Sequence, residues 1–206
     1  PLVPPAQQGP PPPPPRPWDP EELGRICHRI ASFGLCPDSI DLPLSDAVLL
    51  DLPGRAADLE RIKSDIGIAA TAGIRTLTCN FTALRASEGY DQRRGAGRGG
   101  AHLRDFDAAR LDGLPPLPAV GVHSREQMWD RLEVFLKAAV PAAETAGVRL
   151  AMHPNDPPLP VYRGVAQPLD SLAAMLRLTE TIDSPANSIF FDSGVATEWG
   201  ADAVEV

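Results

Sequence analysis

Cysteine and long apolar runs are scarce in this 206-residue sequence. The three cysteines, Cys27, Cys36 and Cys79, are an odd number, and their spacings fit neither a disulfide framework nor a C-x-x-C metal clip. We therefore expect a reducing, cytoplasmic setting. No apolar stretch approaches the roughly 18 residues of a membrane span, and no basic segment followed by an apolar one marks a secretory leader. The sequence predicts no membrane partner.

Positive charge is scarce as well. The 19 Lys and Arg residues are outnumbered by 27 Asp and Glu residues, which gives a formal net charge of −8 and an isoelectric point near 4.9. The most basic stretch is the short run of Arg93, Arg94 and Arg98. Without a basic stripe to neutralise phosphates, no nucleic-acid partner is expected. The 43% of hydrophobic residues suffice for one sizeable core in a single domain.

Proline is concentrated at the start of the chain. Residues 1–17 include the run from Pro10 to Pro15 and are expected to form a disordered tail of exposed polyproline II. The alternative is a ligand for a proline-reading domain. The sequence begins with proline rather than methionine, and its last ten residues have the pattern of a helix that has just begun, with Thr197 as its cap. We expect a piece of a longer chain.

Helical and strand-like patterns alternate from Trp18 onward. Asp19 precedes Pro20 as a typical helix N-cap, and Gly34 ends that helix. Ser124 and Gln127 form the pattern of a capping box at the start of a later helix. Further helices are expected at 58–71 and about 168–181, and strands at 35–42, 74–81, 148–153 and 188–192.

Two helix-to-strand junctions nearly repeat each other. Residues 71–75 read Thr-Ala-Gly-Ile-Arg and residues 145–149 read Thr-Ala-Gly-Val-Arg. Repeated strand–helix units with almost continuously apolar strands predict a parallel sheet covered by helices. We expect a partial (β/α)8 TIM barrel over residues 18–206, which ends before the barrel closes. The long connection over about 82–123 is rich in Gly and Arg, and barrels build substrate sites from such loops.

Two polar side chains are expected at the carboxyl ends of apolar strands. His153 follows an apolar strand and precedes Pro154, where a histidine can bind a metal or transfer a proton, or serve only as a hydrogen-bonded structural residue. Asp192 ends another apolar stretch and could share a divalent cation with His153, or simply cap the following turn. The residues alone leave both alternatives open.

Candidate substrate-binding residues come from the second strand and the long connection. Asn80 could donate a hydrogen bond to a substrate hydroxyl or hold the turn before Thr82. Cations of the connection could bind a carboxylate substrate, although exposed loop arginines are usually solvated. These are Arg85, Arg98, His102 and Arg104, of which Arg85 and His102 are our preferred candidates.

Three stretches resemble mannonate dehydratase and its close relatives. They are Asn80-Phe81-Thr82-Ala83-Leu84-Arg85-Ala86-Ser87-Glu88-Gly89-Tyr90, Met128-Trp129-Asp130-Arg131-Leu132 and His153-Pro154-Asn155-Asp156-Pro157-Pro158. The similarity runs from about Trp18 to Val206. It implies a xylose-isomerase-like TIM barrel that uses Mn²⁺ or Fe²⁺ to convert D-mannonate to 2-dehydro-3-deoxy-D-gluconate in hexuronate catabolism. Enzymes of this type are often homo-oligomers.

The resemblance also assigns roles to individual positions. It implies that His153 is a metal ligand and that Asp192 stands where better-known members have a cysteine ligand. Asn155 stands where the family usually has Asp. Because a carboxylate is a harder ligand than a thiolate, the exchange favours Mn²⁺ or Mg²⁺. The family's other metal ligands and its catalytic histidine and tyrosine correspond to positions beyond Val206, so the catalytic residues are unassigned here and this chain alone is expected to have no turnover.

Two other functions fit the same sequence. A sugar isomerase or epimerase of the same barrel superfamily would share the fold, because fold does not fix chemistry. A non-catalytic, degenerate homologue would fit the change from Cys to Asp at position 192 and the proline-rich tail. Formation of a 2-keto-3-deoxy acid from D-mannonate separates the dehydratase from both.

Overall fold

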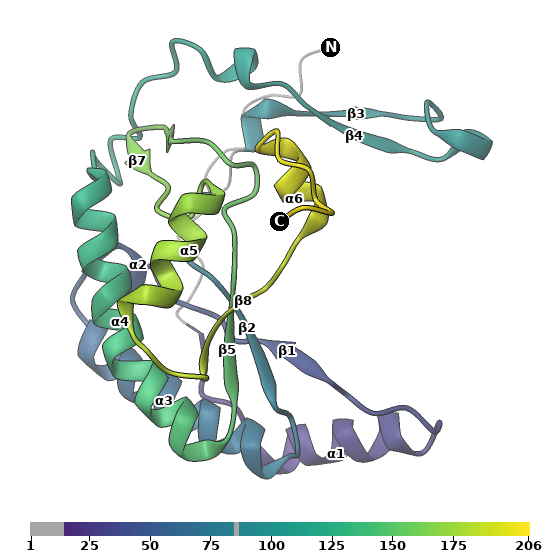
Figure 1. The fold of residues 1–206 in the computed structure, drawn as a ribbon, viewed down its shortest axis with the longest axis vertical. Coiled ribbons are helices and arrows are strands. Elements are labelled where there is room, and N and C mark those ends of the chain that lie inside the picture. The colour runs from purple at the N-terminus through teal and green to yellow at the C-terminus, as the bar shows by residue number, and fades with distance from the viewer. Residues whose placement is uncertain (1–14, 85–86) are drawn as a thin grey trace.

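A four-stranded parallel sheet forms the centre of the protein. The structure is a computed structural model, and it describes residues 15–84 and 87–206. The strand order is β1-β2-β5-β8, and all neighbouring strands run parallel (Figure 1). The strands are β1 (Ser39–Asp41), β2 (Thr76–Asn80), β5 (Arg149–His153) and β8 (Asn187–Ile189). The parallel αβ pattern expected from the sequence is confirmed.

Six α-helices accompany the sheet in the described part of the chain. They are α1 (Pro20–Ala31), α2 (Asp46–Leu50), α3 (Arg55–Thr71), α4 (Arg125–Ala146), α5 (Leu172–Thr181) and α6 (Ser193–Glu198). The expected N-cap of α1 at Asp19 is confirmed, as is the capping box of Ser124 and Gln127 at the start of α4. The short helix α2, capped by Ser45, was not expected. Five residues are too few to show a helical period in a sequence.

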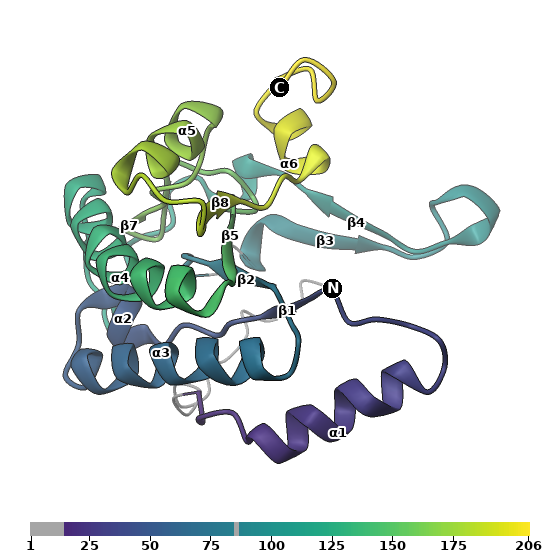
Figure 2. The same cartoon turned by 60° about the horizontal axis from the view of Figure 1, so that its bottom comes forward.

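The hydrophobic core lies where α3 and α4 pack side by side against the sheet (Figure 2). Phe81 and Phe135 are fully buried, and their ring centroids are 6.2 Å apart. The buried positions of α4 recur at helical spacing, as in Leu132, Leu136 and Ala139. In β5, Leu150, Ala151 and Met152 are all buried, as expected for a parallel strand that is covered on both faces. This packing fixes the carboxyl end of β5.

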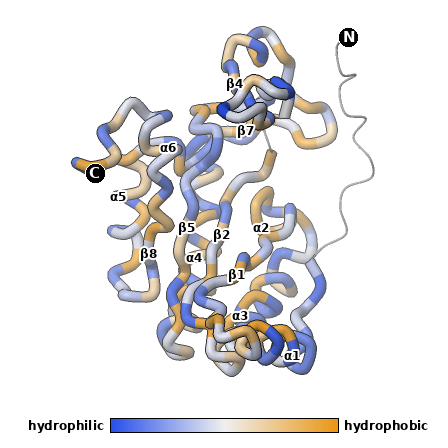
Figure 3. Tube along the Cα trace, turned by 90° about the vertical axis from the view of Figure 1, so that its right-hand side faces the viewer, coloured by the Kyte–Doolittle hydropathy of each residue, from blue (hydrophilic) through white to orange (hydrophobic). Residues whose placement is uncertain are grey.

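Helix α1 differs from the other helices because none of its residues is buried. Its apolar stripe forms as expected, but Ile26 is 48% exposed and Phe33, just beyond the helix, is 73% exposed. The helix lies at the edge of the molecule (Figure 3). It is tied to the core by partial packing of Leu23 and by the backbone N–H of Trp18, which donates to Asp65 Oδ1 at 2.9 Å. The helical pattern thus predicted the local structure correctly but not its burial.

The long connection after β2 contains regular structure rather than one extended loop. The antiparallel strands β3 (Tyr90–Arg93) and β4 (Leu103–Phe106) form a hairpin, which we call the β3–β4 hairpin. It projects past the carboxyl ends of the parallel strands (Figure 1). Short 3₁₀ helices flank and join its strands: η1 (Ser87–Gly89), η2 (Arg98–Gly100) and η3 (Ala108–Leu111). A second small hairpin pairs β6 (Val161–Tyr162) with β7 (Val165–Ala166).

Two expectations for the C-terminal region were wrong. Strand β8 ends at Ile189, so Asp192 does not end the strand and is instead the N-cap of α6. Thr197 lies inside α6 and caps no helix, because Asp192 already accepts hydrogen bonds from the first turn. The expected tail at 1–17 lies mostly outside the described residues. Among the residues described, no helix is both long and apolar enough to cross a membrane.

Candidate metal and substrate site

His153 is the last residue of β5 and lies beside Asn80, the last residue of β2, in the parallel register. Its side chain is 22% exposed. The ring Nδ1 is 2.7 Å from the carbonyl oxygen of Pro154. A carbonyl can only accept a hydrogen bond, so Nδ1 carries a proton and donates it there. The other ring nitrogen, Nε2, faces the carboxylate of Asp192.

Asp192 uses its two carboxylate oxygens for different partners. Oδ1 accepts from the backbone N–H groups of Gly194 and Val195 at 2.8 and 3.0 Å, which is the capping role. Oδ2 lies 3.2 Å from Nε2 of His153. The N–H of Val195 is the largest influence on the pKa of Asp192; together with the Gly194 N–H and His153, it outweighs partial burial and holds that pKa below its ordinary value. Asp192 is therefore a carboxylate at neutral pH.

The geometry of this pair fits a shared divalent cation. Nε2 of His153 and Oδ2 of Asp192 face each other, so a cation placed against both would gain one nitrogen and one oxygen ligand. Two ligands at 90° on an octahedral ion, each about 2.1 Å from it, are separated by about 3.0 Å. The observed 3.2 Å is close to that separation. The Nδ1 donor to a backbone carbonyl is the outer-sphere arrangement that fixes metal-binding histidines.

The pair supplies two ligands and not a complete metal site. Within residues 15–84 and 87–206, no group of three or more His, Cys, Asp or Glu side chains is placed to hold one ion. His153 ends β5, and Asp192 lies in the turn after the neighbouring parallel strand β8, so both belong to the carboxyl-end rim of the sheet. The arrangement can bind one face of a cation and leaves its other positions open.

Asn80 is oriented by a chain of hydrogen bonds from the β5 side of the rim. Asn155 Nδ2 donates to the hydroxyl of Thr82 at 2.7 Å, and that hydroxyl donates to Oδ1 of Asn80. In the described part of the chain, the amide nitrogen of Asn80 has no hydrogen-bond partner. Asn80 is exposed, so this N–H₂ group is available to donate to a ligand beside His153.

Asn155 has a structural role that an aspartate could not fill in the same way. It is 0% exposed, and its Nδ2 also donates to the carbonyl of Phe81 at 3.3 Å. Its Oδ1 accepts from the N–H of Leu169 at 2.6 Å. A carboxylate has no N–H to give to the Phe81 carbonyl. The amide therefore joins the ends of β2 and β5 to the segment before α5.

The other two expected substrate-binding residues are not brought to the pair. Arg85 lies outside the described residues. His102 is exposed and directly precedes β4, at the end of the β3–β4 hairpin where Arg93 pairs with Leu103. The opposite end of the hairpin, at Tyr90, is the one that contacts the loop after β5. Three residues of strand separate these ends by about 10 Å, so His102 lies away from the rim.

Tyr90, Asp156 and Glu198 lie near the pair, and the sequence alone assigned none of them a functional role. The hydroxyl of Tyr90 donates to Oδ1 of Asp156 at 3.3 Å. Burial, followed by the charge of Asp156, raises the pKa of Tyr90, so this phenol is protonated at neutral pH. The pKa of Glu198 is raised as well, mainly by partial burial and then by the charges of Asp156 and Asp192. Tyr90 and Asp156 lie in the quoted motif stretches, which was a usable signal, whereas no sequence pattern marks Glu198.

These carboxylates make the rim strongly anionic. Asp156, Asp192 and Glu198 lie close enough together that the first two disfavour the charge on the third. Such a cluster attracts a divalent cation and repels an anionic substrate. An anion could bind here only with compensating positive charge from a metal ion or from a side chain outside the cluster.

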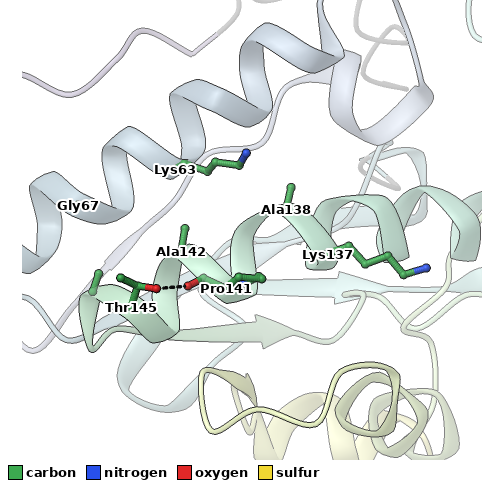
Figure 4. A pocket seen from close by; sticks show the side chains of 8 residues that line it. Lys63, Gly67, Lys137, Ala138, Pro141, Ala142 and Thr145 are labelled. Atoms are coloured by element: carbon green, nitrogen blue, oxygen red, sulfur yellow. Dashed lines mark hydrogen bonds between the residues drawn. The ribbon is translucent and has the colours of Figure 1, made fainter.

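A separate hollow of about 600 Å³ lies on the outer surface between α3 and α4 (Figure 4). Its cations are already paired, Lys63 with Glu60 at 2.7 Å and Lys137 with Glu133 at 3.0 Å. Thr145 donates its hydroxyl to the carbonyl of Pro141 in its own helix at 2.8 Å. The remaining lining is small and apolar, so no set of polar groups converges there and we assign it no ligand.

Comparison with known proteins places this rim in context. A family model described as D-mannonate dehydratase (UxuA) matches residues 11–206. Mannonate dehydratase 2 of Halalkalibacterium halodurans is 28% identical over 201 residues, and mannonate dehydratase of Bacillus subtilis is 26% identical over 207 residues. Each match covers 86% of this chain and 57% of the relative. The chain thus spans a little over half the length of these curated relatives.

Solved structures show the same architecture. The mannonate dehydratase from Streptococcus suis serotype 2 matches with a TM-score of 0.80 and 26% identity, over 91% of this chain and 55% of that one. D-psicose 3-epimerase matches with a TM-score of 0.56 over 87% of this chain, and its 11% identity shows likeness of fold alone. The neighbours are xylose-isomerase-like TIM barrels, so the four-stranded sheet is part of such a barrel, as the sequence predicted.

Proposed function

The chain belongs to the D-mannonate dehydratase family, and from this premise we propose that its protein is a hydro-lyase that converts D-mannonate to 2-dehydro-3-deoxy-D-gluconate. The observation that carries the proposal is the His153–Asp192 pair, whose 3.2 Å separation at the carboxyl-end rim suits two ligands of one cation. The residues match the expected chemistry, because an imidazole and a carboxylate suit Mn²⁺ or Fe²⁺, and the carboxylate also admits Mg²⁺.

The described residues have separate tasks in this reaction. His153 and Asp192 hold the cation, and Pro154 fixes the imidazole through its carbonyl. The bound cation would withdraw charge from the carboxylate and 2-hydroxyl of the sugar acid and so acidify the proton on C2. Asn80 donates from its amide to a hydroxyl of the substrate. Arg85 remains a proposed substrate-binding residue, whereas the remote position of His102 removes the support for its role.

Two proton transfers complete a dehydration: a base takes the proton from C2, and an acid protonates the leaving hydroxyl on C3. We assign neither role to a described residue. The remaining ligands and both proton-transferring groups are proposed to come from the part of the relatives' length that this chain does not span. Without them, the 206-residue chain binds a cation incompletely and does not turn over.

The cellular setting is proposed as the cytoplasm, within hexuronate catabolism. Cys27, Cys36 and Cys79 are all free, and a reducing compartment keeps them so. Buried Cys79 has its pKa raised to about 12 by desolvation and, to a lesser degree, by Asp41, so it is an inert thiol. Association into a homo-oligomer is part of the proposal and is testable by sedimentation of the purified protein.

The test is an assay of the protein made from its complete coding sequence. With Mn²⁺ and D-mannonate we expect a 2-keto-3-deoxy acid, identified by mass and NMR, and no product from the His153→Ala variant. The 206-residue chain is the matched comparison and should give none. An epimerised or isomerised sugar would instead support the isomerase alternative, and no product from the complete protein with any divalent cation would support a non-catalytic homologue.

A further inference from the structure

The base of the β3–β4 hairpin is firmly held against the rim. Arg163, in the β6–β7 turn, pairs with Glu88 at 2.9 Å, and the two side chains are only 15% and 30% exposed. Arg110 donates to the carbonyl of Gly89 at 2.9 Å. Gly89 is buried, and a Cβ added there would lie 2.2 Å from the ring of Phe106. The chain entering and leaving the hairpin therefore has a defined position relative to the loop after β5.

The two faces of the hairpin differ in charge balance. Cross-strand pairing places Tyr90 opposite Phe106 and Gln92 opposite Arg104, so these four side chains share one face. On the other face, Asp105 is paired with Arg93 at 3.1 Å and with Arg110 at 2.9 Å. Arg104, in contrast, forms no ion pair with any carboxylate of residues 15–84 and 87–206.

Arg104 is held by an aromatic ring and not by a carboxylate. Its guanidinium carbon lies 4.0 Å from the ring centroid of Tyr90, a cation–π contact that fixes the planar group while leaving its N–H donors free. The hydroxyl of the same tyrosine donates to Asp156, three residues after His153. The unpaired guanidinium therefore lies on the hairpin face that contacts the rim, over Tyr90, which is itself close enough to Asp156 and Glu198 to feel their charges.

We propose that Arg104 binds the carboxylate of the substrate and selects sugar acids over neutral sugars. The inference rests on the proposed function and names the residue that offsets the charge of the rim. A guanidinium meets a carboxylate with two parallel N–H···O bonds, which a neutral sugar cannot reproduce. Asp156, Asp192 and Glu198 would otherwise repel an anion, so Arg104 provides the charge that allows one to approach.

The test compares ligand binding on the complete protein with Mn²⁺ present, by calorimetry. The ligands are D-mannonate, D-gluconate and D-mannitol, the last being a neutral six-carbon polyol with no carboxylate. The variants are Arg104→Met, Arg104→Lys and, as the matched control, Arg93→Met, which removes the same charge from the opposite face of the same hairpin. Circular dichroism verifies that each variant folds.

Arg104→Met should weaken D-mannonate binding by about 10-fold or more and leave D-mannitol and Mn²⁺ binding unchanged. Arg104→Lys should have an intermediate affinity for D-mannonate, because lysine keeps the charge but lacks the planar guanidinium. Arg93→Met should bind D-mannonate as tightly as the unaltered protein does. Unchanged binding of both sugar acids in Arg104→Met, an equal loss in Arg93→Met, or no preference of the unaltered protein for either sugar acid over D-mannitol would overturn the inference. If D-gluconate binds through Arg104 and D-mannonate does not, the inference stands and the proposed substrate is wrong.

Discussion

The parallel scaffold and the β3–β4 hairpin are held in place by different forces. In α4, eight residues are buried, and Phe135 and Leu132 are completely enclosed. In the strands of the hairpin no residue is buried, and its contacts are ion pairs, two aromatic rings and backbone hydrogen bonds. Buried apolar area stabilises the scaffold, whereas the hairpin depends on a few specific polar contacts. The scaffold should therefore fix the metal pair rigidly, while the hairpin opens at a lower free-energy cost.

The largest expected effect is on the scaffold. Phe135→Ala removes a fully buried ring that packs near Phe81 and should lower the free energy of unfolding by about 3–5 kcal/mol. Phe33→Ala is the matched control, because Phe33 lies just beyond α1 and is 73% exposed. This substitution should change the free energy of unfolding by less than about 0.5 kcal/mol. Urea unfolding followed by circular dichroism measures both. Equal losses would show that α1 is packed more tightly than its exposure indicates.

A smaller, pH-dependent effect is expected at Asp58 of α3, whose carboxylate accepts hydrogen bonds from Ser45 and Arg61. Burial alone would raise the pKa of Asp58, but hydrogen bonds from Arg61 and Ser45 outweigh it and the pKa lies below the ordinary value of 3.8. A carboxyl whose pKa is lower in the folded state stabilises the fold fully above the unfolded-state pKa, and that contribution is lost as the pH falls through the folded-state pKa.

Asp58→Asn should therefore cost about 1–3 kcal/mol at pH 7, and the difference from the unaltered chain should shrink as the pH falls from about 4 toward 2. Urea unfolding of both proteins across this range is the measurement. A difference that stays constant down to pH 2 would mean that the charge of Asp58 contributes nothing.

The smallest effect is expected in the hairpin. Tyr90→Phe keeps the ring that contacts Phe106 and Arg104 but removes the hydrogen bond to Asp156. Because this bond is 3.3 Å long and exposed, the loss should be about 0.5–1 kcal/mol. Hydrogen exchange should show faster opening of the β3 and β4 amides and unchanged protection in β5. Equal acceleration in β5 would show that hairpin and scaffold open together.

Local patterns in the sequence predicted the scaffold well. Asp19 and the Ser124–Gln127 box are caps whose hydrogen bonds reach only a few residues along the chain, so their spacing defines the helix starts. The end of β5 at His153 was likewise predicted, because an apolar run stops there before a proline. The end of β8 was misplaced, because Phe190 and Phe191 continue the apolar run beyond the last paired residue.

The site was predicted less completely than the scaffold. The contact of Asp192 with His153 spans 39 residues; the sequence suggested this partnership as one alternative but wrongly placed Asp192 at the end of β8. The contact of Tyr90 with Asp156 spans 66 residues, and nothing local indicates that the hairpin folds back over the loop after β5. His102 and Arg104 are two residues apart in sequence, yet pairing within the hairpin decides which of them has a fixed position beside the rim.

The most direct test is a titration with Mn²⁺ of the protein made from its complete coding sequence, in which electron paramagnetic resonance measures the concentration of free ion. His153→Ala should weaken binding by more than the roughly 10–100-fold that loss of an outer-sphere partner costs, and Asp192→Asn, which keeps the cap of α6, should also weaken it. His102→Ala should bind Mn²⁺ as the unaltered chain does. Equal Mn²⁺ affinity in all four proteins would contradict the assignment of His153 and Asp192 as metal ligands.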